Sequence, residues 1–304
     1  MKKLPTVTIG IPAYNEEANI KNTLQSILQQ RFAGFEVVEI MVVSDGSTDK
    51  TKEKVKELKD ERIKFIDSKE RLGKPSRQNQ IFKAAKGSII VLFDADVILA
   101  SYRTLHYLVQ PILKNKNVGL VSGYNIVTPG VNLFQKALNV AVQFKERTFS
   151  RLRNGDNIYL CAGRLRAFSP EFKKIIVWPD VFNEDPYSYL LCKFNGFGFV
   201  YEKRAEVYFQ NPSNLRDHRR QSDRFKGMMY EMAKFFPEDF IRLHLSWPKR
   251  LFVESAIYHM VRHPFLFIYY LIIFSFTNIV KANYKKLTTR WEVSITSKVI
   301  TRKV

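Results

Sequence analysis

Short apolar runs alternate with amphipathic stretches over the first hundred residues of the chain. The runs have the length of strands, and the stretches between them carry apolar residues at helical spacing. The runs cover residues 6–12, 36–43, 63–66 and 88–93, and the stretches cover roughly 16–30, 49–58 and 77–86. Strands that alternate with helices in this way are typical of a parallel sheet covered on both faces. The pattern therefore predicts an α/β fold with a doubly wound sheet.

The last of these runs leads directly into two carboxylates, Asp94 and Asp96. Open α/β sheets bind ligands at the carboxyl ends of their strands, where both side chains would lie. Carboxylates in such a place need a cation beside them, and a divalent metal that carries a phosphorylated ligand would suit this pair. The alternative is a strand that simply ends in a capping Asp.

The pattern continues beyond residue 100 with longer elements. We expect a helix at about 102–113, a strand at 118–124, an amphipathic stretch at 131–152, a helix at 187–194 and a basic helix at 213–236. Residues 197–201 and 205–209 suggest a hairpin or two edge strands.

The chain changes character in its last part. From residue 241 onward there are eleven Lys and Arg but two acids, and residues 265–280 carry no charge. This segment is short for a membrane span, which takes about 20 residues, so a shallow, tilted or interfacial helix fits it as well. The basic flanks and tyrosines favour contact with an anionic membrane surface. A buried helix or an oligomer contact is the alternative.

Charge and cysteine content narrow the possible partners and compartments. The chain has 304 residues and a net charge of +20, so we expect an anionic partner: a nucleic acid, an acidic membrane surface or a phosphorylated substrate. The two cysteines, Cys161 and Cys192, lack metal-ligand spacing, which argues against a disulfide framework or a zinc site. The first residues lack the apolar stretch of a signal peptide. We therefore expect the protein in the cytoplasm.

Five short motifs follow one another along the chain. They are Ile-Pro-Ala-Tyr-Asn-Glu-Glu at 11–17, Ser-Asp-Gly-Ser-Thr-Asp at 44–49, Asp-Ala-Asp at 94–96, Asn-Glu-Asp at 183–185 and Gln-Ser-Asp-Arg-Phe at 221–225. Together they resemble a family 2 glycosyltransferase with the glycosyltransferase-A fold, over about residues 5–226. The last motif resembles the Gln-x-x-Arg-Trp signature of polymer-type members, with Phe225 in place of Trp.

The resemblance implies a domain arrangement. A Rossmann-like, mostly parallel sheet flanked by helices would form a catalytic domain at 1–236, with a nucleotide-binding half at 1–100 and an acceptor half at 101–236. Beyond the resemblance, the charge and apolar content of residues 237–304 predict a basic, apolar helical extension that associates with the membrane.

The resemblance also assigns the donor site. Transfer from a nucleotide sugar needs a clamp for the base and cancellation of the diphosphate charge. Asp96, together with Asp94, would bind Mg²⁺ or Mn²⁺, both of which prefer carboxylate and phosphate oxygens. The donor, expected to be a UDP-sugar, would contact Pro12, Tyr14, Glu16, Asp45, Asp94 and Arg224. Lys74 and Arg77 of the basic loop at 71–77 would neutralise phosphate or would only keep the loop soluble.

The acceptor side follows from the remaining motifs. Asp185 would be the base that deprotonates the acceptor hydroxyl, aided by Glu184, and one direct displacement would invert the anomeric carbon. Gln221 and Phe225 would contact the acceptor sugar, and the guanidinium of Arg224 would hold the diphosphate in a bidentate fork. A solvated basic face is the alternative for this helix.

These features favour an inverting, metal-dependent glycosyltransferase at the inner face of the cell membrane. It would pass a sugar from a UDP-sugar to a hydroxyl of a glycan or lipid-linked acceptor, with no nucleic-acid partner. A synthase of polyprenyl- or dolichyl-phosphate sugars is the alternative within the enzyme class, because its acceptor phosphate needs no base. A nucleic-acid-binding protein is the alternative that the charge alone would explain.

Overall fold

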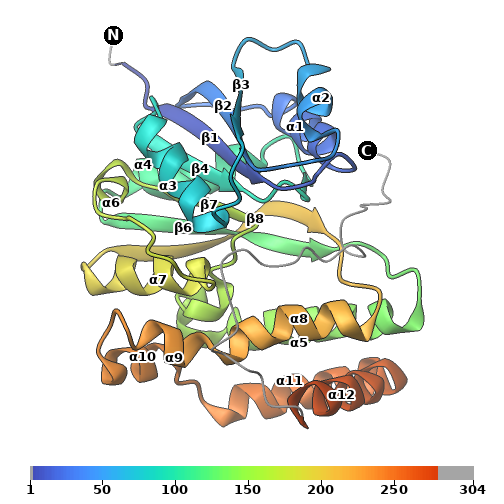
Figure 1. Ribbon diagram of the computed structural model, residues 1–304. Coiled ribbons are helices and arrows are strands. Elements are labelled where there is room, and N and C mark those ends of the chain that lie inside the picture. The colour runs from blue at the N-terminus through green and yellow to red at the C-terminus, as the bar shows by residue number, and fades with distance from the viewer. Residues whose placement is uncertain (1–2, 280–304) are drawn as a thin grey trace.

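The computed structural model describes residues 3–279, which form a mixed eight-stranded sheet with helices on both faces (Figure 1). The strand order is β3-β2-β1-β4-β7-β6-β8-β5. The strands are β1 (Thr6–Ala13), β2 (Glu36–Asp45), β3 (Ile63–Ser68), β4 (Ile89–Phe93), β5 (Ile98–Leu99), β6 (Val118–Val127), β7 (Leu165–Phe168) and β8 (Gly198–Phe209). The main helices are α1 (Ile20–Leu28), α2 (Thr51–Lys56), α3 (Lys74–Ala84), α4 (Thr104–Lys114), α5 (Leu133–Phe149), α6 (Pro170–Lys173), α7 (Glu184–Phe194), α8 (Leu215–Lys226), α9 (Met228–Met232), α10 (Glu238–Leu245), α11 (Lys249–Arg262) and α12 (Pro264–Ile279).

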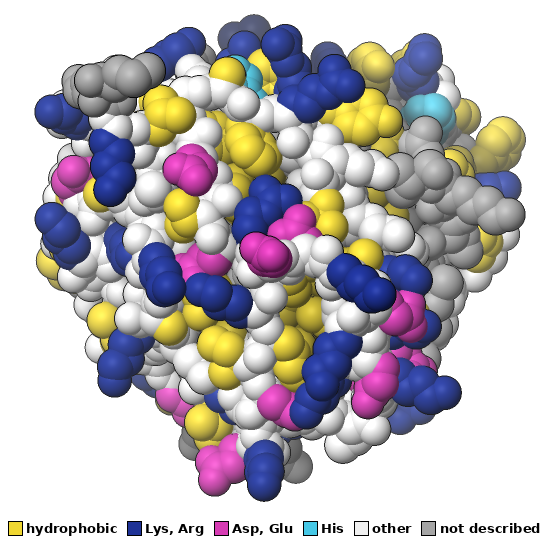
Figure 2. Space-filling view, turned by 90° about the horizontal axis from the view of Figure 1, so that it is seen from above, with side chains coloured by type: hydrophobic (Ala, Val, Ile, Leu, Met, Phe, Trp, Pro, Cys, Tyr) yellow, Lys and Arg dark blue, Asp and Glu magenta, His cyan; other side chains and the backbone are white. Residues whose placement is uncertain are grey.

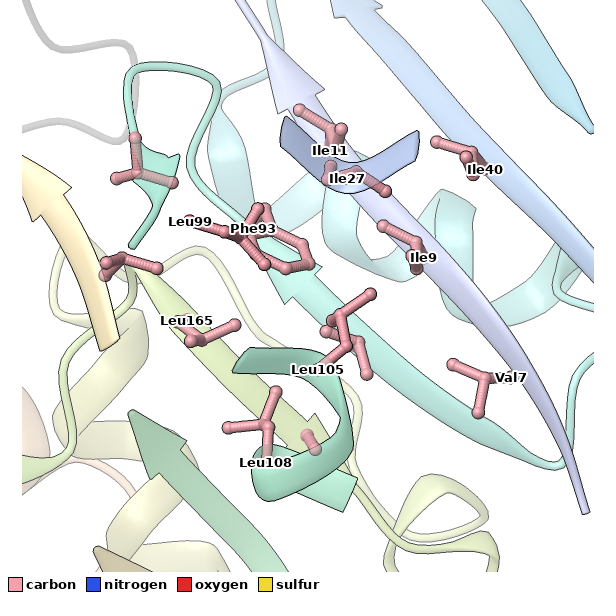
Figure 3. Close-up of a cluster of buried hydrophobic side chains, with 14 of the residues drawn as sticks. Val7, Ile9, Ile11, Ile27, Ile40, Phe93, Leu99, Leu105, Leu108 and Leu165 are labelled. Atoms are coloured by element: carbon pink, nitrogen blue, oxygen red, sulfur yellow. The ribbon is translucent and has the colours of Figure 1, made fainter. Parts of the chain in front are cut away.

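The first four strands run parallel and are those that the apolar runs predict. β1 pairs with β2 on one side and with β4 on the other, and β3 follows β2 at the edge. Figure 3 shows Ile9 and Ile11 of β1 beside Phe93 of β4, with Leu105 and Leu108 of α4 packed below them. Burial on both faces explains why these strands read as continuous apolar runs.

The opposite face of the sheet is covered by α3, α6, α7, α9 and α10. Phe82, Phe168 and Trp178 meet edge to face there, with ring centroids 4.8, 5.1 and 5.7 Å apart. Such contacts add about 0.5–1.5 kcal/mol each beyond the area they bury. Ile241 of α10 belongs to the same cluster, so α10 packs with this layer.

The sheet is mostly parallel, as predicted, and is mixed because β7 lies antiparallel to both of its neighbours, β4 and β6, and β5 lies antiparallel to β8. Leu165 of β7 is opposite Phe93 of β4. Residues just before β7 therefore lie at the carboxyl end of β4, where the Asp94 N–H donates to the carbonyl of Arg164 over 3.2 Å. A segment distant in sequence thus joins the edge that carries the acids.

The expected hairpin at residues 197–209 is wrong, because both apolar pieces belong to the single strand β8. β8 runs parallel to β6, and the register shifts where Glu202 and Glu206 face consecutive residues of β6. The polar residues Lys203 and Arg204, which suggest a turn, lie in this irregularity. The expected helix at 213–236 is likewise divided, into α8 and α9, at Gly227.

The last helices form a layer of their own. In Figure 1, α5 and α8 lie below the sheet, and α11 and α12 lie beyond them. One side of α12 buries Phe267, Tyr270 and Ile273 against α5. Its other side exposes apolar side chains, among them Phe265, which is 87 % exposed. The buried-helix alternative therefore describes only half of α12.

The described helices place a limit on the predicted membrane contact. None of them within residues 3–279 combines the length and the apolar character that crossing a bilayer requires. The basic residues Lys281, Lys285 and Lys286, on which part of the membrane prediction rests, lie outside the described residues.

Candidate active site

Acidic side chains from two distant segments meet at the carboxyl end of β4. Asp94 and Asp96 follow β4, and Glu184 and Asp185 form the first turn of α7. Lys74, the first residue of α3, connects the two segments, because its Nζ lies 2.6 Å from Asp94 Oδ1 and 2.6 Å from Glu184 Oε1. The structure therefore brings together four of the predicted site carboxylates around one predicted lysine.

Lys74 sets the charge state of its two partners. Burial alone would raise the pKa of Asp94 and of Glu184, but the Lys74 ammonium, together with Arg166 for both acids and Arg164 for Asp94, holds both pKa values below their usual range. Burial would lower the pKa of Lys74 itself, and the carboxylates of Asp94 and Glu184 reverse that effect and raise it. All three groups are therefore charged at neutral pH.

Asp185 differs from these carboxylates. Burial, followed by the charge of Glu184, raises the pKa of Asp185 to about 6. Arg166 of β7 is fully buried and places its Nη2 3.1 Å from Asp185 Oδ1, although the two atoms do not have the orientation of a hydrogen bond. This carboxylate thus titrates close to neutrality and keeps an oxygen lone pair available, as a general base requires.

Arg166 is itself fixed by the wall of the site. Its Nη1 donates to Ser188 Oγ over 2.9 Å, and Trp178 Nε1 donates to the same oxygen over 2.9 Å. Ser188 Oγ in turn donates to the carbonyl of Glu184 over 2.6 Å. The guanidinium and the first turn of α7 are therefore held by one connected set of hydrogen bonds.

Asp96 carries the charge that its surroundings neutralise least. Burial and then the neighbouring Asp94 carboxylate raise the pKa of Asp96, whereas Lys74 pairs with Asp94 and not with Asp96. Carboxylate oxygens suit Mg²⁺ and Mn²⁺. Within residues 3–279 no group of three or more His, Cys, Asp or Glu side chains is arranged to hold a metal ion. The residues therefore fit a metal that takes its remaining ligands from a diphosphate and water.

Asp45 and Arg77 form a buried pair that orders the basic loop. Asp45 accepts hydrogen bonds from the N–H groups of Leu72 and Gly73, over 2.8 and 3.0 Å, and from Arg77 Nε over 2.8 Å. Arg77 also donates to Gln80 and to the carbonyl of Glu70. The Arg77 guanidinium is thus committed to the loop, and its contact with a donor phosphate stays a prediction.

The loop after β1 lies against the loop after β2, as the donor prediction requires. Asn15, at φ 52°, accepts from the Thr48 N–H over 2.8 Å, and the Glu16 N–H donates to Thr51 Oγ1 over 2.8 Å. The guanidinium of Arg71 stacks on the ring of Tyr14, 3.9 Å from its centroid. Pro12, the last residue but one of β1, is half-buried.

Helix α8 brings Arg224 to the acids. Burial lowers the pKa of the Arg224 guanidinium. The nearby carboxylates of Glu184, Asp185 and Asp94 act in the opposite direction and favour its charged form. The carbonyl of Arg224 accepts from Asn183 Nδ2 over 3.1 Å. On the same helix, Gln221 is half-buried and Phe225 is 62 % exposed, so the Phe225 ring is available to a ligand.

Sequence reasoning missed several residues of the site. Arg164 and Arg166 flank the start of β7, and their i, i+2 spacing inside an apolar segment indicates two cations on one face of a strand. Gly163 leaves room for the base, because a Cβ there would lie 2.5 Å from Asp185 Oδ1. Glu231 of α9 accepts from the N–H groups of Phe182 and Asn183, over 2.8 and 3.0 Å, and gave no signal in the sequence.

Comparison with known proteins identifies the family. The model of glycosyl transferase family 2 matches residues 8–175, more than half of the chain. The chain belongs to glycosyl transferase family 2. This match includes the loop after β1, the Asp94-Ala95-Asp96 segment, Arg164 and Arg166, and it confirms the family that the motifs indicate.

Similar proteins include a probable glycosyltransferase of Bacillus subtilis, YdaM, which is 31 % identical over 146 residues. The glucosyltransferase WfgD of Escherichia coli, named for transfer from UDP-Glc to GlcNAc-diphosphoundecaprenol, is 32 % identical over 121 residues. The matches cover 46 % and 40 % of this chain, and 34 % and 46 % of the respective relatives. The chain thus spans less than half of the length of either relative.

Among solved structures, the mannosyltransferase PcManGT of Pyrobaculum calidifontis, in complex with GDP-Man and Mn²⁺, aligns with a TM-score of 0.61. The alignment covers 92 % of this chain and 76 % of the other, at 19 % identity. This likeness confirms the predicted glycosyltransferase-A type of α/β fold.

The nucleic-acid alternative rests on net charge alone. Figure 2, which views the molecule from above, shows Lys and Arg side chains scattered among Asp and Glu over the whole face rather than gathered in one stripe. A continuous basic surface is the footprint of nucleic-acid binding, and the face seen in Figure 2 does not carry one.

Proposed function

We propose that this protein is an inverting, metal-dependent glycosyltransferase that moves a sugar from a UDP-sugar to a hydroxyl of a glycan or lipid-linked acceptor. The observation that carries the proposal is Asp185, a carboxylate whose pKa is raised to about 6, within a cluster of cations and acids at the carboxyl end of β4. A base with this pKa is largely ionised at neutral pH and still accepts a proton readily.

The chain's own residues would perform three tasks. Asp185 would take the proton of the acceptor hydroxyl as that oxygen attacks the anomeric carbon, and Arg166 would hold the carboxylate in place. The guanidinium of Arg224 would stabilise the negative charge that develops on the leaving diphosphate. Because attack and departure occur in one displacement on opposite sides of the sugar, the configuration would invert.

Asp96 and Asp94 would hold a divalent metal. When bound, Mg²⁺ or Mn²⁺ supplies charge neutralisation for the diphosphate. The mannosyltransferase of similar fold forms a complex with both GDP-Man and Mn²⁺, which supports this choice. Lys74 already neutralises Asp94 and Glu184, so Asp96 is the carboxylate with the most to gain from a bound cation.

The nucleotide would lie at the loops after β1 and β2. Pro12 and Asp45 lie at the carboxyl ends of β1 and β2, and Tyr14 and Glu16 lie in the loop after β1. Asp45 would act indirectly, because its hydrogen bonds order residues 72–77. UDP is our choice because WfgD is named for UDP-Glc. GDP, the nucleotide of the GDP-Man in the mannosyltransferase complex, is the competing nucleotide in the test below.

We further propose that the protein works at the cytoplasmic face of a membrane, attached peripherally. The support is the exposed apolar side of α11 and α12, where Val261 is 79 % and Phe265 is 87 % exposed, with Arg250 and Arg262 on the same helices. An apolar helix face rimmed by basic residues suits an anionic lipid surface. A lipid-linked acceptor would then arrive from this side.

The test of the proposed function begins with binding. Calorimetric titration of UDP-sugars and GDP-sugars, with and without Mn²⁺, should give a metal-dependent signal for one nucleotide. The Asp185→Asn variant should keep this binding and lose about 10²–10⁴-fold in transfer. Asp239→Asn, the same change on an exposed acid of α10, is the matched control and should keep full activity.

Two outcomes would change the proposal. Full hydroxyl transfer by the Asp185→Asn variant would refute the role of Asp185 as base. If that variant instead retained transfer to a polyprenyl phosphate, the synthase of polyprenyl-phosphate sugars would replace the hydroxyl transferase, because a phosphate nucleophile needs no base. NMR of the product's anomeric centre tests the inversion.

A further inference from the structure

A patch of aromatic and acidic side chains lies between the sheet and α5, the helix below it in Figure 1. Its centre is Tyr124 of β6, whose ring meets the ring of Tyr201 of β8 at 67°, with the centroids 6.4 Å apart. Tyr201 Oη donates to Oε2 of Glu146, on α5, over 2.7 Å. All three side chains are half-buried. The mechanism proposed above uses none of them.

The pairing of the strands places this patch on the same face of the sheet as the catalytic base. Arg166 of β7, whose guanidinium lies beside Asp185, is opposite Ser122 of β6. Ser122 is in turn opposite Tyr201 of β8. Residues that are opposite each other point to one face of a sheet, and Tyr124 shares this face because it follows Ser122 by two positions. Neighbouring strands lie about 4.8 Å apart, so Tyr201 stands roughly 10 Å from Arg166 along this row.

The segment beside the base crosses the same face. The N–H of Ala162 donates to Ser122 Oγ over 3.3 Å. The next residue is Gly163, where a Cβ would lie 2.5 Å from Asp185 Oδ1. Tyr124 lies farther than Ser122 toward the carboxyl end of β6, and β6 runs in the direction of β4 because both are antiparallel to β7. The patch and the base therefore lie at one edge of the sheet, the edge at which β4 ends.

Tyr124 and Glu146 keep hydrogen-bonding capacity that the fold does not fill. Glu146 accepts one hydrogen bond, from Tyr201, whereas an ionised carboxylate has room for about four. Within residues 3–279, no cation lies within ion-pair distance of Glu146, and Tyr124 Oη makes no hydrogen bond. Burial raises the pKa of Glu146, and neither the Tyr201 hydroxyl nor the charge of Lys203 reverses this effect. A ligand that donates hydrogen bonds to the carboxylate would offset the cost of its burial.

The charges around Tyr124 indicate the class of ligand. Glu206 of β8 is opposite Tyr124 and adds a second carboxylate that has no ion pair in the described part of the chain. Burial, and next the charges of Glu146 and Glu206, raise the pKa of the Tyr124 hydroxyl. Two carboxylates repel a phosphate or any other anion. Sugar hydroxyls, by contrast, are uncharged donors, and the C–H face of a sugar ring complements the negative face of an aromatic ring.

We propose that Tyr124 and Glu146 form a subsite for the sugar that precedes the accepting sugar in a glycan acceptor. The inference rests on the proposed function and narrows its acceptor to an oligosaccharide whose sugar at this position is uncharged. The Tyr124 ring packs against that sugar, and Glu146 accepts from its hydroxyls. Because the row from Arg166 to Tyr201 is longer than one sugar ring, the sugar that reacts at Asp185 does not reach the patch, and the next sugar of the chain does.

The experiment measures binding of neutral sugars to the full chain, saturated with Mn²⁺ and the nucleoside diphosphate that binds. Saturation-transfer NMR titrations use glucose, mannose and N-acetylglucosamine and the disaccharides of each as probes. The wild type should bind a disaccharide about tenfold more tightly than its monosaccharide. Glu146→Gln should remove this advantage, because a hydrogen bond to a charged group contributes about tenfold or more, and should leave monosaccharide and nucleotide binding within twofold.

Two further variants sharpen this result. Glu61→Gln, the same change at an exposed acid before β3, is the matched control and should bind like the wild type. Tyr124→Ala should weaken disaccharide binding about threefold or more, because the contact between ring and sugar is lost, and Tyr124→Phe should restore most of it. In transfer to the disaccharide that binds, Glu146→Gln and Tyr124→Ala should raise KM and leave kcat unchanged, since neither change touches Asp185.

Thermal unfolding separates sugar binding from a structural role of Glu146. Because the folded state raises the pKa of Glu146, its ionisation opposes folding at pH 8. Glu146→Gln should therefore unfold at the same temperature as the wild type or higher. A carboxylate that serves only to tie α5 to β8 would instead lower the unfolding temperature when replaced.

Three results overturn the proposal: no binding of any of these sugars, an equal effect of Glu61→Gln, or equal weakening of monosaccharide and disaccharide by Glu146→Gln. The proposed function fails separately, when no nucleotide binds or when Asp185→Asn retains full transfer. Sugar binding is measured without transfer, so the titrations test the subsite in either case.

Discussion

The two halves of the active site handle charge in opposite ways. On the donor side, Asp45 and Arg77 are both buried, and the carboxylate accepts from three donors within 3.0 Å. On the acceptor side, Arg164 is half-buried, stacks on the ring of Phe209 and has no acid within ion-pair distance in the described part of the chain. This difference separates charged groups that hold the fold together from those that remain available to a ligand. Removing a group of the first kind should lower stability, and removing a group of the second kind should lower activity.

Removal of Arg77 should have the largest effect. Arg77→Met leaves the buried carboxylate of Asp45 without its cation, which typically costs about 3–5 kcal/mol. Arg164→Gln removes an arginine that lacks an acidic partner and should change the free energy of unfolding by no more than about 1 kcal/mol while it lowers transfer. Urea unfolding of both variants measures the contrast. Equal losses of stability would abolish the distinction between the two halves.

Gly163→Ala should lower activity while binding is preserved. A Cβ at this position would lie 2.5 Å from Asp185 Oδ1 and 2.9 Å from Lys74 Nζ, so the base must move. Misplacing a catalytic group by a fraction of an ångström to 1 Å lowers kcat by about 10²-fold. Gly198→Ala, where the nearest atom would lie 3.5 Å away, is the control. A variant with normal kcat would mean that the free space beside the base has no importance.

The pH dependence should report Asp185. A base must be ionised, and its pKa of about 6 predicts that kcat/KM falls tenfold for each pH unit below about 6. Glu184→Gln removes a like charge that raises this pKa, so the acidic limb should move to lower pH. Because the folded state raises the pKa, ionisation of Asp185 opposes folding above pH 6, and Asp185→Asn should be the more stable protein at pH 8. An acidic limb that stays in place in Glu184→Gln would contradict the assignment.

The smallest effect is expected at the apolar side of α12. Phe265→Asp places a charge on an exposed ring, so stability should change by less than about 0.5 kcal/mol. Binding to anionic vesicles in a sedimentation assay should fall several-fold, and transfer to a soluble acceptor should not change. Unchanged vesicle binding would remove the support for membrane attachment through this face.

The sequence predicted the donor half well because its signals are local. Each of the first four strands is a continuous apolar run, and Asp94 and Asp96 follow one of them directly. The acceptor half depends on pairing between distant segments. Nothing in Leu165–Phe168 indicates that this strand lies antiparallel between β4 and β6, and the Lys203-Arg204 irregularity in β8 has the composition of a turn.

The same limit explains which site residues were found. Glu184, Asp185 and Arg224 belong to motifs and meet at the site as expected, whereas their roles stay predictions. Arg166 was missed because an arginine in a strand usually points to solvent, and only the position of Asp185 beside it explains its complete burial.

Glu231 has a consequence for engineering this enzyme. It belongs to α9, directly after the helix that carries Gln221 and Arg224, and its carboxylate holds the backbone N–H groups of Phe182 and Asn183 at the entrance to α7. Residues 182–185 and the α8–α9 segment are thus a single exchangeable unit. A chimera that imports α8 and α9 from a relative to change acceptor choice should retain a positioned base only if it imports residues 182–185 with them.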